Sequence, residues 1–311
     1  MRIFSFALFV HFISLVASFQ TNLPHGGRFT SRKSNSFLAV SFPKWEDMPV
    51  PKVEDPPYES PNEMEKWIFH WNKSLVDTVY QLICFLYPVK GVPRDYARFF
   101  VLETVARVPY FAYLSVMHFR ETFGQRFDGK DSLRDRMRTH YAEADNELHH
   151  LLIMESLGGN GSIIDRTFAH WISFFYYWYV VSAFAMNEAA AYHLSELIED
   201  HAYNTYDKYL TEHEKMLKEQ PVPGIAHEYY EEENLYLFDT FCTVREINEN
   251  GSVPPLRRPK LETLYDVFVN IRDDEKEHWK TLCNLVQHND MHAVTASEVK
   301  STNPVSRKSI E

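Results

Sequence analysis

The feature that most constrains this chain is a pair of Glu-x-x-His motifs, Glu147/His150 and Glu275/His278. Each lies in a long segment whose apolar residues recur every three or four positions, as on one face of an α-helix. Residues three apart share a helix face, so the carboxylate and the imidazole can bind one metal ion. Four-helix bundles with a carboxylate-bridged pair of metal ions take one such motif from each of two helices and one Glu from each of two others. The sequence therefore predicts a helical bundle with a metal centre, although a single copy of the motif would lie as easily on a solvated helix face.

Composition supports a helical fold and removes several classes of function. The 311 residues are 45% hydrophobic and 15% aromatic, with 10 Gly and little strand-type alternation, which favours an all-α protein. A formal charge of −11 argues against binding to nucleic acid, which requires basic patches. Three cysteines without CxxC spacing argue against a disulfide framework and against a thiolate metal site.

The N-terminal region is predicted to be targeting and linker sequence. Residues 1–18 combine a short basic start, an apolar run and a small-residue cleavage site, as signal peptides do. A membrane anchor is the alternative, but the run is short for one. Residues 19–44 contain no Asp or Glu and resemble a transit peptide, and residues 45–64 form a Pro-rich arm. A two-part presequence of this kind predicts delivery to a plastid, to its thylakoid or inner membrane.

Residues 65–290 are expected to form the folded domain, and residues 291–311 a polar, disordered tail. Within the domain, Pro109 and Gly124 indicate a kink and a helix end. Residues 219–259, rich in Pro and in acidic runs, are expected to be irregular. The periodic segments predict helices over 65–86, 94–123, 131–157, 163–186, 188–210 and about 261–288.

Two of these helices are unusually aromatic. Residues 163–186 are long and apolar enough to raise the question of a membrane span, but polar residues border the run. We interpret this segment as a bundle helix flanked by a membrane surface. Trp67, Trp71 and Tyr80 mix with Lys residues, which fits either a membrane-interface face or a helix packed on the bundle.

A carboxylate inside an apolar segment is a further candidate ligand. Glu103 lies among Val and Phe residues, where a carboxylate must be paired, protonated or bound to a metal. An ion pair with Arg107, one helical turn later, is the alternative.

Four segments carry a more specific signal. They are Leu102–Tyr110, Asn146–Glu155, Glu199–Lys208 and Tyr265–Glu275. In this order they resemble the alternative oxidase family, and most closely its plastid branch, over about residues 65–288.

Individual residues favour the plastid branch over the mitochondrial one. The third segment reads Glu199-Asp200-His201 where mitochondrial members typically have three Glu in a row. Lys276 departs from the family pattern, in which Ala is expected.

The resemblance implies a membrane-bound di-iron quinol oxidase that acts on plastoquinol and O2. The implied fold is an all-α, ferritin-like four-helix bundle with additional helices at a membrane interface. The implied ligands of two iron ions are Glu103, Glu147, His150, Glu199, Glu275 and His278. The other implied roles are catalysis for Tyr206, quinol binding for Arg98, Leu102 and Thr205, and orientation of the ligands for Asn146 and Asp274. A homodimer is left open.

Three other functions remain open at this point. The first is a mitochondrial-type ubiquinol oxidase, and the second is a di-iron hydroxylase or desaturase acting on a lipid. Both would use the same ligands. The third is a ferritin-like protein that binds iron without turnover. The two aromatic helices argue against this third function, because a soluble iron store would not need them.

Overall fold

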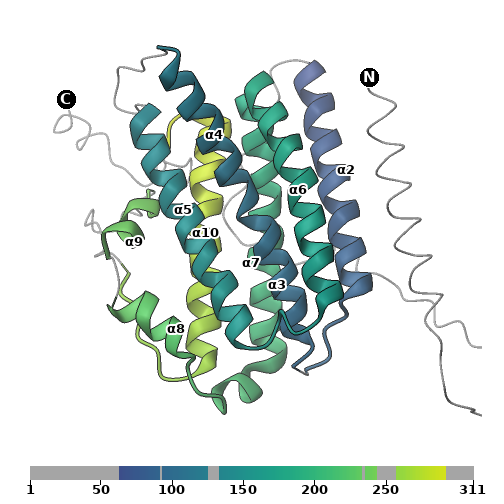
Figure 1. The fold of residues 1–311 in the computed structure, drawn as a ribbon, viewed down its shortest axis with the longest axis vertical. Helices are drawn as coiled ribbons and strands as arrows, with labels where there is room; N and C mark the ends of the chain where they lie inside the picture. The colour runs from purple at the N-terminus through teal and green to yellow at the C-terminus, as the bar shows by residue number, and fades with distance from the viewer. Residues whose placement is uncertain (1–62, 92, 125–132, 233–234, 244–256, 292–311) are drawn as a thin grey trace, which may run out of the picture. The chain divides into compact units, whose positions relative to one another are not determined.

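A computed structural model describes residues 63–91, 93–124, 133–232, 235–243 and 257–291 (Figure 1). The described residues contain helices and no strand, which confirms the all-α prediction. The α-helices are α2 (Glu63–Leu86), α3 (Asp95–Ala106), α4 (Val108–Thr122), α5 (Leu133–Ser156), α6 (Ile163–Met186), α7 (Glu188–Lys218), α8 (Gly224–His227), α9 (Leu235–Phe241) and α10 (Leu264–His288), with a π-helical turn, η2 (Glu228–Glu232), after α8.

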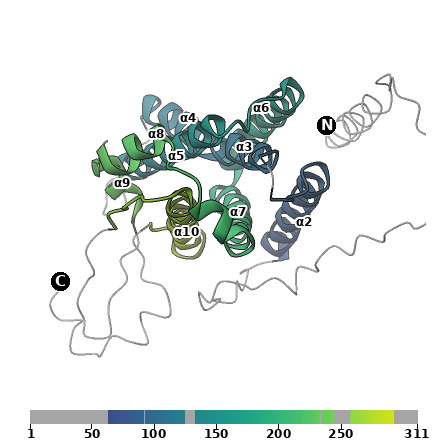
Figure 2. The same cartoon turned by 90° about the horizontal axis from the view of Figure 1, so that it is seen from below.

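The helices lie in two layers when viewed along their axes (Figure 2). Helices α3, α4, α5 and α6 form one layer, and α2, α7 and α10 form the other. The most extensive pairing is between α7 and α10, and α3 packs against both α5 and α7. Helices α3, α5, α7 and α10 therefore surround a common interior, and each carries at least one predicted ligand.

Capping residues set several of the helix boundaries. Thr263 and Asp266 form a capping box that begins α10, and Asn187 Oδ1 accepts a hydrogen bond of 3.1 Å from the Ala190 amide at the start of α7. Helix α10 ends at Asn289, whose φ of 54° is left-handed, a conformation that Asn tolerates better than most residues. The boundaries thus follow from local chemistry at each end.

The helix expected over 94–123 is broken once. Arg107 separates α3 from α4, and Pro109 occupies the first turn of α4, where its missing N–H costs least. The segment ends at Gly124, whose φ is +86°. The break agrees with the predicted kink.

Two boundaries predicted from the sequence are wrong. The helix expected over 188–210 continues to Lys218, with non-helical dihedral angles at His213 (φ −125°, ψ 18°). The segment 219–259 is not wholly irregular, because α8, η2 and α9 lie within it. Pro223 is the N-cap of α8 and marks a helix start, where Pro is well tolerated. The predicted segments 1–18 and 19–44, most of the Pro-rich arm and nearly all of the tail lie outside the described residues.

The aromatic helix α6 is buried on one side only. Val180 and Phe184 are fully buried, whereas Trp171 and Trp178 are exposed. By length and composition, the described residues contain one helical segment apolar enough to cross a membrane, Asp95–Thr122, and 72% of its most apolar stretch is buried. That segment is α3 with α4, and its burial is that of a core helix.

Candidate metal centre

The six predicted ligands converge in the interior of the bundle. Glu103 comes from α3, Glu147 and His150 from α5, Glu199 from α7, and Glu275 and His278 from α10; all six side chains are buried. Their donor atoms form two groups in which every atom lies within 4.8 Å of the others. One group, the Glu103 half, is Glu103, His150, Glu147 and Glu275, and the other, the Glu199 half, is Glu199, His278, Glu147 and Glu275.

Glu147 and Glu275 belong to both halves. Each imidazole also approaches the carboxylate of the other motif: His150 Nδ1 lies 3.2 Å from Glu275 Oε1, and His278 Nδ1 lies 3.0 Å from Glu147 Oε1. Within its own motif, each imidazole is 4.0 Å from the carboxylate. The two motifs therefore interlock, and two shared carboxylates between two sets of end ligands is the arrangement of a bridged pair of cations.

The unpaired atoms at the centre fit two bound cations. Among the described residues, both oxygens of Glu147 and of Glu275 are buried without a hydrogen-bond partner, as is Nδ1 of each imidazole. Glu103 and Glu199 each have one such oxygen. Buried polar atoms are almost always hydrogen-bonded, so a cluster of unpaired donors facing one point indicates an absent ligand. Carboxylate and imidazole donors suit iron and other first-row metals.

The pKa values of the clustered side chains also indicate that the site binds two cations. Burial, and after it the neighbouring carboxylates, raise the pKa of Glu147 and of Glu275 well above the usual value. Burial also raises the pKa of Glu199 and lowers the pKa of His278. Four carboxylates in one buried cluster cannot all ionise without compensation, and two divalent cations would match their charge.

Each end carboxylate accepts a hydrogen bond from a buried tyrosine. Tyr206 of α7 donates to Glu103 Oε1, and Tyr110 of α4 donates to Glu199 Oε1 at 2.6 Å. Tyr206 was singled out from the sequence, whereas Tyr110 was not, although it lies in the quoted segment Leu102–Tyr110. Its role was missed because Pro109 predicts the kink but not the direction in which α4 then runs past the centre.

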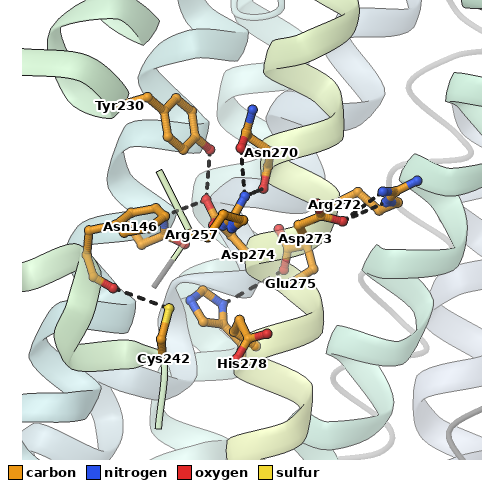
Figure 3. A network of polar contacts seen from close by, with 12 residues as sticks. Asn146, Tyr230, Cys242, Arg257, Asn270, Arg272, Asp273, Asp274, Glu275 and His278 are labelled. Carbon is orange, nitrogen blue, oxygen red and sulfur yellow. Dashed lines mark hydrogen bonds and ion pairs between the residues drawn. The ribbon is translucent and has the colours of Figure 1, made fainter. Parts of the chain in front are cut away.

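Asp274 connects the Glu103 half to a wider polar network (Figure 3). Its Oδ2 accepts from Tyr230 at 2.8 Å and from Asn146 at 3.0 Å, and lies 3.1 Å from His150 Nε2. Arg257 forms an ion pair with Oδ1. The carboxylate thus holds the outer nitrogen of His150, the arrangement that fixes an imidazole's orientation in metal sites.

Tyr230 and Arg257 were not predicted from the sequence. Both lie in the segment expected to be irregular. The π-helical turn η2 buries Tyr229 and Tyr230 together, and Tyr229 accepts a hydrogen bond of 2.7 Å from Asn146. Such turns recur at functional sites.

The candidate quinol residues lie beside the centre. Arg98 is 8% exposed, and its Nη2 donates to Tyr80 at 3.3 Å and to Cys84 Sγ at 3.2 Å. Thr205 Oγ1 lies 3.2 Å from the same Tyr80 hydroxyl, so α2 joins two of the three residues. The third, Leu102, is half-buried next to Glu103.

The alternative ion pair between Glu103 and Arg107 is wrong. Glu103 accepts from Tyr206 and lies 3.6 Å from His150 Nδ1. The Arg107 guanidinium instead lies over the Phe111 ring, 4.5 Å from its centroid. The turn between α3 and α4 separates the two side chains.

Comparison with known proteins identifies the family. The family model "Alternative oxidase" matches residues 92–287, a stretch that contains all six clustered side chains. The chain is also 48% identical over 237 residues to "Ubiquinol oxidase 4, chloroplastic/chromoplastic" of Arabidopsis thaliana. That match covers 73% of this chain and 63% of the relative, so the chain spans less than two thirds of the relative's length. Because the family model covers more than half of its residues and includes the whole metal centre, this chain belongs to the alternative oxidase family.

Proposed function

We propose that the protein is a membrane-bound quinol oxidase of plastids, which oxidises plastoquinol and reduces O2 to water with a pair of iron ions. The observation that carries the proposal is the buried double cluster with its two shared carboxylates, Glu147 and Glu275. Family membership and the printed name of the Arabidopsis relative, a chloroplastic ubiquinol oxidase, support the reaction and the compartment.

The six predicted side chains would hold the two iron ions: Glu103 and His150 at one end, Glu199 and His278 at the other, and Glu147 and Glu275 between them. When bound, such a pair of ions supplies the site at which O2 accepts electrons. The clustered donors are carboxylates and imidazoles, a set that suits iron ions with positions open for oxygen.

The chain's own residues connect this centre to a quinol site. Arg98 is a buried cation whose described hydrogen bonds go to a phenol and a thiol, so it is suited to bind a quinol oxygen. Thr205 shares the Tyr80 hydroxyl with Arg98. The next residue, Tyr206, donates to the ligand Glu103, so its phenol lies between the quinol residues and the metal centre. Tyr206 is suited to pass an electron or a proton from the quinol residues to the metal centre.

A continuous aromatic surface would place the quinol site at a membrane. Helices α2, α4 and α6, with the C-cap of α4, expose Trp67, Trp71, Phe111, Phe119, Phe123, Ile163, Ile164, Trp171, Phe174, Phe175 and Trp178. Contact between Tyr179 and Trp71 joins α2 to α6. Soluble monomers rarely expose apolar patches of this kind, so we assign this surface to one leaflet of a bilayer, from which the quinol reaches Arg98.

Oxygen uptake by the purified, iron-loaded protein tests the proposal. A short-chain plastoquinol analogue should sustain uptake with cyanide present. Absence of uptake with a full iron complement would overturn the oxidase function. A hydroxylase or desaturase would require an external electron donor, and an iron-binding protein without turnover would show no steady quinol oxidation.

A further inference from the structure

A second buried polar network approaches the metal centre from the end opposite the quinol residues. Its members are Glu143 and His140 on α5 and Tyr192 on α7, each at most 1% exposed. His140 Nδ1 lies 2.6 Å from Glu143 Oε2, and His140 Nε2 lies 3.1 Å from the Tyr192 hydroxyl. The imidazole therefore contacts one proton-carrying group at each ring nitrogen.

The outer end of this network reaches solvent. Tyr192 hydrogen-bonds with Arg136, and Arg136 Nη1 lies 3.7 Å from Glu188 Oε2. The Glu188 side chain is 33% exposed. His140 and Tyr192 are 52 residues apart in the sequence, and so are Arg136 and Glu188. Because both pairs are in contact at the same separation, α5 and α7 run parallel here. From Glu188, the path runs about 16 Å along α7 before it reaches Glu199.

The inner end faces the Glu199 half of the metal centre. Glu143 lies one helical turn before Glu147, on the same helix face, and its charge acts on His278. The Tyr110 ring lies 6.0 Å from the His140 ring and 5.6 Å from the His278 ring, between the network and the ligand. Glu143 Oε1 and His278 Nε2 are both buried without a hydrogen-bond partner among the described residues.

We propose that Glu143, His140 and Tyr192 form a proton relay that supplies the oxygen-reducing centre from the end of the bundle at Glu188. The proposal rests on the oxidase function above. Two quinols release four electrons and four protons as they become quinones. One O2 takes up four electrons and four protons as it becomes two waters. The quinol protons are released near Arg98 and Thr205. In this proposal Tyr206 passes electrons from the quinol to the centre, and the relay brings protons to the oxygen site, which four helices enclose.

The chemistry of each member suits transfer in small steps. An imidazole accepts a proton at one nitrogen and releases the other proton from the second nitrogen. The Tyr192 hydroxyl accepts one hydrogen bond while donating another, so it need not ionise. Arg136 keeps its proton and holds Glu188 at the outer end. Glu188 lies one helical turn before Tyr192 on α7 and its charge acts on that phenol, so the proton passes from Glu188 to the Tyr192 hydroxyl beside the guanidinium. Burial raises the pKa of Glu143 to about 8, which keeps a proton on this carboxyl near neutral pH.

Tyr192 has a matched control in Tyr113. Both side chains are at most 1% exposed, and their ring centroids are 4.9 Å apart. The Tyr113 hydroxyl, however, contacts Ser195 Oγ at 2.5 Å and donates to the Ala191 carbonyl, outside the relay. Each substitution by Phe therefore removes one buried hydroxyl, but only Tyr192→Phe interrupts the relay.

The test compares Tyr192→Phe with Tyr113→Phe in the iron-loaded protein, by oxygen uptake with quinol in H2O and in D2O. We expect Tyr192→Phe to lower turnover at least tenfold and to increase the solvent isotope effect, since proton transfer becomes limiting. Tyr113→Phe should leave both values near those of the wild type. Equal behaviour of the two variants, with an active wild type, would overturn the relay alone, whereas an inactive wild type with full iron would overturn the oxidase function itself.

A second measurement does not depend on turnover. The infrared spectrum of the iron-loaded wild type should contain the C=O stretch of a protonated carboxylic acid. This band should shift in D2O and be missing from Glu143→Gln, so that it appears in the difference between the two spectra. The ligand carboxylates, bound to metal, do not contribute to this band. Glu143→Asp should keep the band and recover part of the turnover lost in Glu143→Gln. A spectrum without the band in the wild type would remove Glu143 from the relay.

Discussion

The two halves of the metal centre have the same ligands but different surroundings. In the Glu103 half, the outer nitrogen of His150 faces Asp274, which is itself paired with Arg257. In the Glu199 half, the outer nitrogen of His278 has no hydrogen-bond partner in the described part of the chain. Asn146 occupies, one residue before Glu147, the position that Asp274 occupies before Glu275. Asn146 donates to Tyr229 and to Asp274, so it supports the carboxylate that holds His150 and has no counterpart at His278 among the described residues.

This difference separates structural from chemical tasks. In the Glu103 half, the ion pair of Asp274 with Arg257 holds His150. Tyr206 connects this half to the candidate quinol residues, because it donates to Glu103 and follows Thr205 in the chain. The Glu199 half lies beside Tyr110 and the buried Glu143, where protons would arrive. A centre that receives electrons at one end and protons at the other needs such an asymmetry.

The largest effect is expected where the two halves overlap. Glu275→Ala removes a ligand that both groups share, so we expect loss of both metal ions and of measurable turnover. Iron analysis and oxygen uptake check this result. Glu277→Ala is the control on the same helix, because Glu277 pairs with Lys280 at 3.1 Å and is not among the clustered side chains. Turnover retained in Glu275→Ala would show that the metal assignment is wrong.

The next prediction concerns the charge of Asp274, which distinguishes the Glu103 half from the Glu199 half. Asp274→Asn keeps the size of the side chain but leaves Arg257 without its carboxylate and weakens the hold on His150. Loss of such a partner typically lowers metal affinity or activity by about 10–100-fold. Metal affinity and turnover should therefore fall in Asp274→Asn. Asp273→Asn, which affects the more exposed pair with Arg272, should change neither.

The two tyrosines that hydrogen-bond to the end carboxylates allow a more direct comparison. Tyr206→Phe and Tyr110→Phe each remove one buried hydroxyl that donates to a ligand. If electrons arrive through the Glu103 half, Tyr206→Phe should lower turnover by roughly tenfold or more. Tyr110→Phe should lose only its hydrogen bond to Glu199, which is about 2 kcal/mol of local stabilisation. Single-turnover oxidation of the reduced protein by O2, followed by quinol-driven rereduction, separates the two variants. Equal losses in both would mean that the halves do not divide the task.

The ligand set was more accessible from sequence than its surroundings. The two Glu-x-x-His motifs are local in the sequence, so helical periodicity alone placed His150 near Glu147 and His278 near Glu275. The apolar segment around Glu103 made it a candidate, and the resemblance joined it and Glu199 to the two motifs, to which no local spacing connects them. Tyr110 and Arg257 reach the centre because of the direction that α4 takes after Arg107 and because the chain returns after α9. Pro109 predicted the kink, but no short pattern encodes either direction.

The same limit explains the missed helices. Prolines and acidic residues over 219–259 were interpreted as irregular structure, but Tyr230, Phe238 and Phe241 are buried there and cover the metal centre. Tertiary packing overrides local breaker signals when a segment can bury large aromatic side chains. The network of Glu143, His140 and Tyr192 was missed for a related reason: its members come from two helices and share no sequence motif.

Another buried imidazole, outside both halves, sharpens their comparison, because it shows what burial does to the pKa of a histidine. His193 of α7 stacks on Phe69 and contacts Asn72, and burial lowers its pKa from 6.5 to about 4. The folded protein then binds fewer protons than the unfolded chain between these values. The stability that neutral His193 contributes is complete above pH 6.5 and is lost as the pH falls towards 4, by up to roughly 3 kcal/mol.

Replacing this imidazole by a side chain that does not titrate should remove that pH dependence. We expect the free energy of unfolding of His193→Gln, measured by denaturant titration on protein prepared without metal, to fall less between pH 7 and pH 5 than that of the wild type. The difference between the two slopes cancels the titration of the carboxylate cluster, which both proteins share. An unchanged slope would mean that His193 takes up a proton in the folded protein as readily as in the unfolded chain, and burial alone could not then explain the lowered pKa of His278.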